Sequence, residues 1–415
     1  MKKSSILIAL ASVIALVVPA SALELGDIKV GGQIEVRGMA KDIDMPDGYN
    51  DWVIQRALLS LSADVADNTS AYLLLGESGR VWGNNVADQD VKFKEAYLKF
   101  VDIRDVVDLT VGRQAIGIAH DPILYFGVKD NHYLSVTALD AFRADLNIRD
   151  LGDLTLFGGK LKEESIEPWE EDRQEEIEVY GIVASTEWLV PLGTLRGYFY
   201  LQDGEDVPPD RLGQDFGVIG LSVRAEVPAV DGLGYKLEVA KNTGDYEGLA
   251  YILAGSYDLP LAWADLGFSL EYVAADGGKE EYNEDMFKPI APDAAYGGVW
   301  NIPDFAGRTI SNQKIICLGV KLIPAAEGWD RLTVGLKYIV LKADEEDWFV
   351  LGGEGFALDD DELGNEVDLS FTYTLSESIS LAGSFGYFMP GDAFPVVDYG
   401  DDDAYKVMVK AIVKF

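Results

Sequence analysis

Charged side chains recur on one face of several stretches in which apolar and polar residues alternate. A period of two places neighbouring side chains on opposite faces of a β-strand, so the charged members of each stretch share a face. Around a water-filled lumen, such fixed charges select the ions that permeate, although they also serve to pair with one another. The pore-lining candidates are Arg37, Arg56, Arg113, Arg143, Arg196, Glu95 and Asp145. Arg113 is the ambiguous member, because strict alternation opposes it to Gln114.

Runs of carboxylates mark the long connections between these stretches. Carboxylate oxygens are ligands that Ca²⁺ prefers, but no run has the complete spacing of a dedicated calcium loop. The alternative is a solvated acidic rim that bridges to lipid phosphates through divalent ions. The candidate Ca²⁺ ligands are Asp359, Asp360, Asp361, Asp401, Asp402 and Asp403. We predict no other cofactor.

The chain has two histidines, His120 and His132, and a single cysteine, Cys317. One cysteine excludes an intramolecular disulfide, and this pair of histidines has no cysteine near it to complete a metal-binding motif. A hydrolase would need a serine or cysteine nucleophile beside a histidine, and no such motif is present. We therefore predict neither a catalytic site nor a transition-metal site, and no enzymatic activity.

The segment 115–136 joins two alternating stretches and contains both histidines. Its composition is apolar and aromatic, which an exposed loop avoids. Folding into the lumen would bury this surface and narrow the pore, so we predict that the segment forms a constriction. The constriction candidates are His120, Asp121, Tyr125, Lys129 and His132.

These side chains need a framework of strands, which the C-terminal stretch 405–415 shows most clearly. Every second residue is apolar or aromatic, from Tyr405 to Phe415, and three lysines occupy the other face. Aromatic residues at both ends of an apolar face are typical of a strand that crosses lipid between two interfacial girdles. The stretch resembles the closing strand of bacterial outer-membrane barrels, and Phe415 is expected to be the signal for the barrel-assembly machinery.

The same alternation predicts an all-β fold, a transmembrane antiparallel up-and-down β-barrel. We count eighteen strands, with sixteen as the alternative. The connections alternate between long and short, as external loops and periplasmic turns do in such a barrel. The expected strands span 28–40, 52–65, 70–77, 92–101, 107–114, 137–148, 153–162, 176–189, 194–203, 214–226, 233–241, 247–258, 264–275, 310–323, 331–343, 365–375, 377–388 and 404–415.

The N-terminal segment 1–22 has the form of an export signal. Lys2 and Lys3 precede a short apolar run, and Ala20-Ser-Ala22 supplies small residues for cleavage. The barrel domain is then expected over 23–415. The net charge of −37 argues against nucleic acid as a partner. An exported barrel is expected in the bacterial outer membrane, in contact with its lipid and lipopolysaccharide.

Several motifs resemble the alginate-export family of outer-membrane porins. They are Ala96–Phe100, Leu109–Gln114 with its Gly-Arg-Gln element, Phe126-Gly127, Asp140–Arg143, Gly364–Leu369, Tyr373, Gly386–Asp392 with its Phe-Met-Pro-Gly-Asp element, and the closing strand. The resemblance spans most of the barrel domain in order and implies a monomeric barrel of eighteen strands. It also implies a lumen whose arginines guide an anionic uronate polymer, a role that would carry over to Arg56, Arg113 and Arg143.

Two functions fit these observations. The first is a passive channel for small hydrophilic solutes or anionic saccharides, which needs a hydrated lumen and weak contacts. The alternative is a structural or adhesive outer-membrane protein with a filled lumen and acidic surface loops. The conductance of the barrel distinguishes the two.

Overall fold

The computed structural model describes most of the chain from residue 28 onward. The described residues are 28–42, 50–82, 91–131, 134–149, 151–165, 174–190, 192–205, 215–278, 284–294, 296–299, 309–346, 349–351, 354–356, 358, 360–393 and 403–415. The predicted export signal over 1–22 lies outside them. No helix among the described residues is long and apolar enough to cross a membrane.

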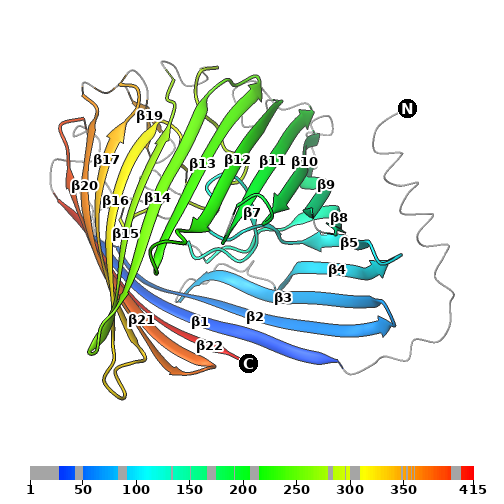
Figure 1. Cartoon of the computed structure of the whole chain (residues 1–415), viewed down its shortest axis with the longest axis horizontal. Coiled ribbons are helices and arrows are strands. Elements are labelled where there is room, and N and C mark those ends of the chain that lie inside the picture. Colours follow the sequence, from blue (N-terminus) through cyan, green and yellow to red (C-terminus); the bar gives the residue numbers. More distant parts are fainter. Residues whose placement is uncertain are drawn as a thin grey trace.

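The described residues form one closed antiparallel β-barrel (Figure 1). Each strand pairs with its sequence neighbours in the barrel, and β1 pairs with β22 to close the sheet, so the predicted count of eighteen strands is confirmed. The barrel strands are β1 (Lys29–Asp42), β2 (Asn50–Ala66), β3 (Thr69–Val81), β4 (Lys92–Ile103), β5 (Val107–Gln114), β8 (Leu139–Ile148), β9 (Gly152–Ser165), β10 (Gln174–Thr186), β11 (Gly193–Glu205), β12 (Phe216–Glu226), β13 (Leu233–Gly244), β14 (Leu249–Pro260), β15 (Ala264–Ala275), β16 (Gln313–Pro324), β17 (Leu332–Ala343), β20 (Glu362–Ser376), β21 (Ile379–Pro390) and β22 (Ala404–Lys414).

Four further strands are short and lie in the long connections. β6 (Ile116–Gly117) pairs with β7 (Tyr125–Phe126), and β18 (Phe349–Leu351) pairs with β19 (Glu354–Phe356). Most long connections lie at one end of the barrel, where they follow β1, β3, β5, β9, β11, β15, β17 and β21. Short turns connect the strands at the opposite end. We call the two ends of the barrel the loop rim and the turn rim. β1 begins and β22 ends at the turn rim.

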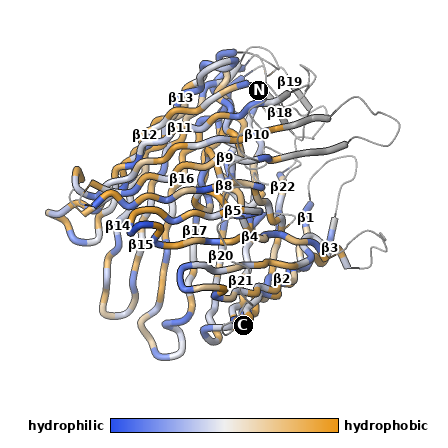
Figure 2. The backbone as a smooth tube through the Cα atoms, turned by 90° about the vertical axis from the view of Figure 1, so that its right-hand side faces the viewer, coloured by the Kyte–Doolittle hydropathy of each residue, from blue (hydrophilic) through white to orange (hydrophobic). Residues whose placement is uncertain are grey.

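The two faces of the wall differ in polarity because alternate side chains meet different surroundings. Apolar side chains face outward along the middle of the strands, for example Leu221 on β12 and Val239 on β13, with exposed fractions of 54% and 49%. They are cross-strand neighbours, and exposed apolar side chains recur on the other strands, so the outer surface carries an apolar band. The backbone trace coloured by hydropathy shows the alternation along each strand (Figure 2). The apolar band is the surface that a transmembrane barrel presents to lipid.

The terminal Phe415 closes the seam between the first and last strands. Its backbone exchanges two hydrogen bonds with Gly32 of β1, from Gly32 N to Phe415 O at 2.8 Å and from Phe415 N to Gly32 O at 3.1 Å. A Cβ on Gly32 would lie 2.6 Å from Cζ of the Phe415 ring and 2.5 Å from the carbonyl oxygen of Leu58. The glycine therefore leaves the space in which the terminal ring lies against β1.

Replacing Gly32 with alanine is expected to impair closure of the barrel, because the added methyl group displaces the Phe415 ring or the β2 backbone. The measurement is the fraction of refolded protein that keeps the compact, heat-sensitive mobility of a folded barrel on a denaturing gel. Gly38→Ala is the matched control on the same strand, since a Cβ there meets no atom within 4 Å. Equal folded fractions for the two variants would contradict this role of Gly32.

Candidate functional site

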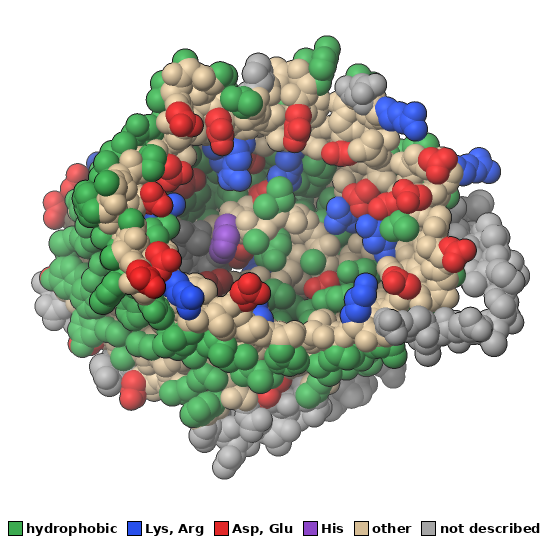
Figure 3. All heavy atoms as spheres, turned by 60° about the horizontal axis from the view of Figure 1, so that its bottom comes forward, with side chains coloured by type: hydrophobic (Ala, Val, Ile, Leu, Met, Phe, Trp, Pro, Cys, Tyr) green, Lys and Arg blue, Asp and Glu red, His purple; other side chains and the backbone are tan. Residues whose placement is uncertain are grey.

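A hollow opens on the turn-rim side of the barrel lumen (Figure 3). We call this cavity of about 1050 Å³ the vestibule; its walls come from β11 to β17. Three basic and four acidic side chains line it, Arg224, Lys236, Lys337, Glu187, Glu226, Asp258 and Glu271. His120 also lines it, and its ring is 60% exposed. The vestibule is thus a polar space of nearly balanced charge, large enough to admit water.

The segment 115–138, which we call the first inner loop, runs across the lumen from β5 to β8. On one side Asp121 contacts Arg196 of β11, and on the other Asp130 contacts Arg37 of β1 and Lys410 of β22. β11 lies far from β1 and β22 in the strand order, so the loop bridges facing walls. His132 lies outside the described residues.

A cluster of buried charges holds the far end of this loop to the wall. Glu35 binds both arginines of the wall, with Oε1 2.6 Å from Nη2 of Arg37 and Oε2 2.7 Å from Nη2 of Arg56. Arg37 also pairs with Asp130, whose other carboxylate oxygen lies 3.0 Å from Nζ of Lys410. We call these five residues the ion clamp.

Two of the predicted pore-lining residues belong to the ion clamp and are covered by the first inner loop. Arg37 and Arg56 do face inward, but each is only 3% exposed beneath the first inner loop. Arg37 Nη1 donates to the carbonyl of Asn131 at 3.1 Å, and Arg56 Nη1 donates to that of Lys129 at 2.8 Å. In this conformation both arginines hold the loop and neither contacts the open lumen.

Asp130 is the member of the ion clamp that the loop contributes. Burial alone would raise the pKa of its carboxyl group, but Arg37 and Lys410 hold that pKa well below its ordinary value. The carboxylate therefore stays charged at neutral pH and in mild acid. Its side chain is still 48% exposed, so water reaches the edge of the clamp.

The near end of the first inner loop is fixed by Asp121. Its Oδ1 accepts hydrogen bonds from the backbone of Ile123 at 2.8 Å and Leu124 at 3.2 Å, and its Oδ2 lies 3.3 Å from Nη1 of Arg196. Burial raises the pKa of Asp121, neighbouring Glu238 adds to the increase, and Arg196 opposes it. Arg196 also donates to the hydroxyl of Tyr200 at 2.5 Å. Its guanidinium group is thus occupied by contacts within the protein and is not open to a solute.

Tyr125 and Lys129 brace the first inner loop from within. The hydroxyl of Tyr125 donates to the carbonyl of Val128 at 3.3 Å, and Nζ of Lys129 donates to the carbonyl of Pro292 at 3.2 Å. Pro292 belongs to another connection, between β15 and β16, which sequence reasoning left among the external loops. We call this connection, 276–312, the second inner loop.

The two inner loops are joined by backbone hydrogen bonds inside the barrel. Tyr125 N donates to Ala291 O at 2.8 Å, Ala291 N donates to Ile123 O at 3.2 Å, and Asp293 N donates to Asp121 O at 2.9 Å. Further along, Val299 N donates to Glu366 of β20 at 2.7 Å, so the second loop also reaches the wall. A signal was present in its sequence, since 286–299 is as apolar as the segment 115–136.

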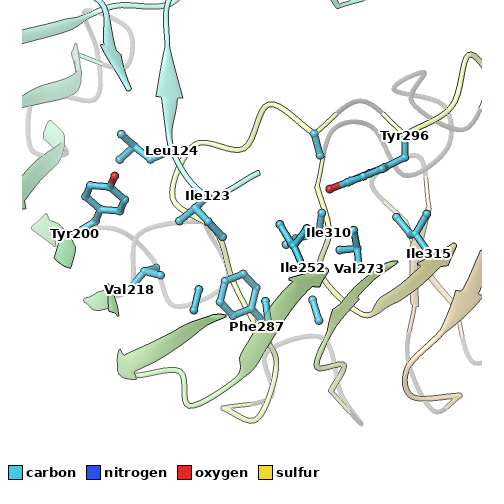
Figure 4. Packing of buried hydrophobic residues seen from close by; sticks show 14 of the residues in the cluster. Ile123, Leu124, Tyr200, Val218, Ile252, Val273, Phe287, Tyr296, Ile310 and Ile315 are labelled. Atoms are coloured by element: carbon cyan, nitrogen blue, oxygen red, sulfur yellow. The ribbon is translucent and has the colours of Figure 1, made fainter. Parts of the chain in front are cut away.

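Apolar side chains of both loops pack against the inner wall on the loop-rim side (Figure 4). Ile123 and Leu124 of the first loop and Phe287 of the second are at most 1% exposed. They share a cluster with wall residues such as Val218 of β12 and Ile252 of β14. Among the described residues, this half of the lumen is therefore largely filled, whereas the turn-rim half is open.

Arg143, Asp145 and Glu95 line a smaller recess on β4, β5 and β8, with a volume of about 190 Å³. Nε of Arg143 lies 2.9 Å from Asp145, and the two side chains are 34% and 31% exposed. Glu95 is more buried, with 8% of the residue exposed. The recess pairs its own charges but remains accessible from the lumen.

Arg113 lies on the outer face of the barrel, which corrects its inclusion among the pore-lining candidates. It is the cross-strand neighbour of Asp140 on β8, and its Nη1 lies 3.0 Å from that carboxylate. Asp140 alternates with the buried Leu139 and Ala141, which point inward. Strict alternation puts Arg113 and Gln114 on opposite faces of β5. Gln114 is 3% exposed and points inward, so Arg113 points outward, as alternation alone would have predicted.

The described members of the acidic runs, Asp360, Asp361 and Asp403, lie at the loop rim. Asp359, Asp401 and Asp402 are outside the described residues. Of the others, Asp360 accepts backbone hydrogen bonds from Asp361 and Glu362, Asp361 pairs with Lys342 at 3.0 Å, and Asp403 accepts from Tyr387. No group of three or more His, Cys, Asp or Glu in the described part of the chain could hold a metal ion. Binding of Ca²⁺ by these loops stays a prediction.

No protein-family model and no curated protein sequence matches the chain, so the resemblance to the alginate-export family is not confirmed. Solved structures do match. The outer membrane protein OprD from Pseudomonas aeruginosa is 14% identical, with a TM-score of 0.64 over 96% of each chain. OccK11 (OpdR) from the same organism is 12% identical, with a TM-score of 0.61 over 93% of this chain and 96% of that chain.

A third structure, P. aeruginosa OpdK with vanillate, is 12% identical, with a TM-score of 0.58 over 93% of this chain and 99% of that chain. The likeness extends over almost the full length of each protein, so it includes the strands and most of their connections. At these identities it establishes the fold. The chain is therefore a closed antiparallel β-barrel of eighteen strands, an architecture that it shares with these outer membrane proteins of P. aeruginosa.

Proposed function

We propose that the protein is a channel of the bacterial outer membrane that passes small hydrophilic solutes, including short anionic saccharides. The observation that carries the proposal is a wall with an apolar outer band and a charged, water-accessible vestibule inside. A soluble barrel has no reason to expose such a band, and a solute path needs a hydrated space with weak contacts. The likeness to outer membrane proteins, one of them solved with vanillate, supports the same interpretation.

Small solutes suit this lumen better than an extended uronate polymer. The polymer role that the alginate-export resemblance implied would need Arg56, Arg113 and Arg143 in one open path. Arg56 is covered, Arg113 faces outward, and Arg143 is the member of these three that lines accessible space. Outer-membrane lipid, lipopolysaccharide and the assembly machinery that recognises Phe415 complete the proposed set of partners.

The test is single-channel conductance of the refolded barrel in a planar bilayer with a salt gradient. We expect discrete open steps with weak ion selectivity, because the basic and acidic groups of the vestibule nearly balance. Lys337→Glu in the vestibule is expected to shift the selectivity toward cations. Lys160→Glu is the matched control, since Lys160 is the cross-strand neighbour of the outward-facing Asp140. Absence of steps from folded protein would contradict a channel.

A structural or adhesive protein is the second candidate, and the apolar filling of the loop-rim half favours it. In that case the inner loops would be a permanent plug and the acidic loops the working surface. Folded protein without open steps, together with binding of intact cells or matrix to the loop rim, would support this candidate over the channel.

A further inference from the structure

The first inner loop is attached to the two walls by different kinds of contact. Near its start, Ile116, Ile123, Leu124 and Phe126 are at most 3% exposed and belong to the large apolar cluster. The described residues of its tip, 127–131 and 134–138, contact β1, β2 and β22 mainly through the ion clamp. The apolar contact of the tip is a separate small cluster of Leu134 with Met39 and Ile54.

The two attachments differ in the free energy needed to break each of them in water. Exposing the apolar cluster is unfavourable in proportion to its area, so the start of the loop stays on its wall. Buried ion pairs lose much of their attraction to the desolvation of both partners, and their charges are solvated again once water enters. Water reaches the edge of the ion clamp directly, because the side chain of Asp130 is 48% exposed. The tip is therefore the part that detaches first.

We propose that this tip is a flap that leaves the β1, β2 and β22 wall while the rest of the loop stays in place, and that its opening exposes an anion-attracting surface. Asp130 departs with the flap, whereas Glu35, Arg37, Arg56 and Lys410 remain on the wall. These four residues, three cations and one carboxylate, carry a net charge of +2. This inference rests on the proposed channel function, in which the flap would act as the gate.

Two variants with opposite charge changes test the flap. Asp130→Asn and Lys410→Gln each break the contact at 3.0 Å between these side chains. A closed and an open flap should give a narrower and a wider conductance level. Lys410→Gln is expected to lengthen the dwell time in the wider level by about tenfold, since one hydrogen bond between charged groups is lost. Asp130→Asn also weakens the pair with Arg37, so it should have the larger effect of the two. The double variant should exceed Asp130→Asn by little, because Lys410→Gln removes a contact that Asp130→Asn has already broken.

The selectivity of each level supplies an independent readout. In wild-type protein the wider level should be more selective for anions than the narrower level, because Arg37, Arg56 and Lys410 become accessible only on opening. Asp140→Asn is the control: it breaks an ion pair of the same length on the outer face and should leave dwell times unchanged.

The outcomes separate the flap from the channel itself. If Asp130→Asn and Lys410→Gln shift ion selectivity in opposite directions with unchanged dwell times, the charges act directly on ions and the flap is refuted. Equal selectivity of the two levels would refute it as well. If neither wild-type nor variant barrels give steps although they fold, the channel function fails, and the flap with it.

Discussion

Replacing Glu35 with glutamine is expected to lower the free energy of unfolding by about 3–5 kcal/mol. Glu35 is 1% exposed and is the wall residue that binds both Arg37 and Arg56. Glutamine keeps the shape of the side chain but removes its charge, so two buried guanidinium groups share a neutral partner. The measurement is reversible unfolding in urea of the barrel in lipid vesicles, followed by tryptophan fluorescence.

Two controls distinguish this effect from a general response to charge removal. Asp140→Asn also removes a carboxylate from an ion pair with arginine, but that pair lies at the loop-rim ends of β5 and β8, and its side chains are 58% and 39% exposed. There its loss should cost at most about 1 kcal/mol. Replacing Glu35, Arg37 and Arg56 together with apolar residues of similar volume should recover most of the stability, because no uncompensated charge remains. A Glu35→Gln variant as stable as the Asp140→Asn variant would show that the arginines have sufficient partners without Glu35.

Leu221→Arg is expected to destabilise the barrel in a bilayer by about 2–4 kcal/mol. Leu221 lies in the middle of β12, faces outward, and is 54% exposed. The cost arises because a charged group at this depth would be transferred from water into hydrocarbon. Unfolding in vesicles against urea measures it, and the difference should shrink in a detergent micelle, where water reaches the side chain more easily.

Ser222→Arg is the matched control for this second prediction. Ser222 is the next residue of β12, so it faces the lumen, and its cross-strand neighbour on β13 is Glu238. The same substitution one position along should therefore cost much less. Similar losses at the two positions would contradict the assignment of the outer face to lipid.

Local periodicity was enough to predict most of the wall. Alternate side chains of each strand meet lipid or lumen, and this contrast is present in every stretch whatever its neighbours are. The parity of long and short connections then set the order of the strands, since each strand pairs with the next. The expected span 264–275 coincides with β15, and 107–114 coincides with β5. Errors fall at strand ends, where pairing with a neighbour extends a strand beyond its own pattern.

Periodicity predicted less about which loops enter the lumen and which charged side chains they cover. The apolar composition of 115–136 indicated an inward loop, and the comparable signal in 286–299 was present but not used. Alternation correctly turned Arg37 and Arg56 inward. It could not show that the first inner loop covers Arg37, because the hydrogen bond from this arginine to the carbonyl of Asn131 joins residues 94 positions apart that meet only after the barrel closes.

The number of strands, their direction and the side to which each side chain points thus followed from the chain's own pattern, because a period of two between two solvents is a local property. Which charges are open to solute, and which are bound in the ion clamp, depended instead on tertiary contacts. Which charged side chains are covered depends on where the two inner loops cross the closed barrel. It also depends on whether the attraction between charges from distant strands offsets the cost of their desolvation. No local pattern contains that balance.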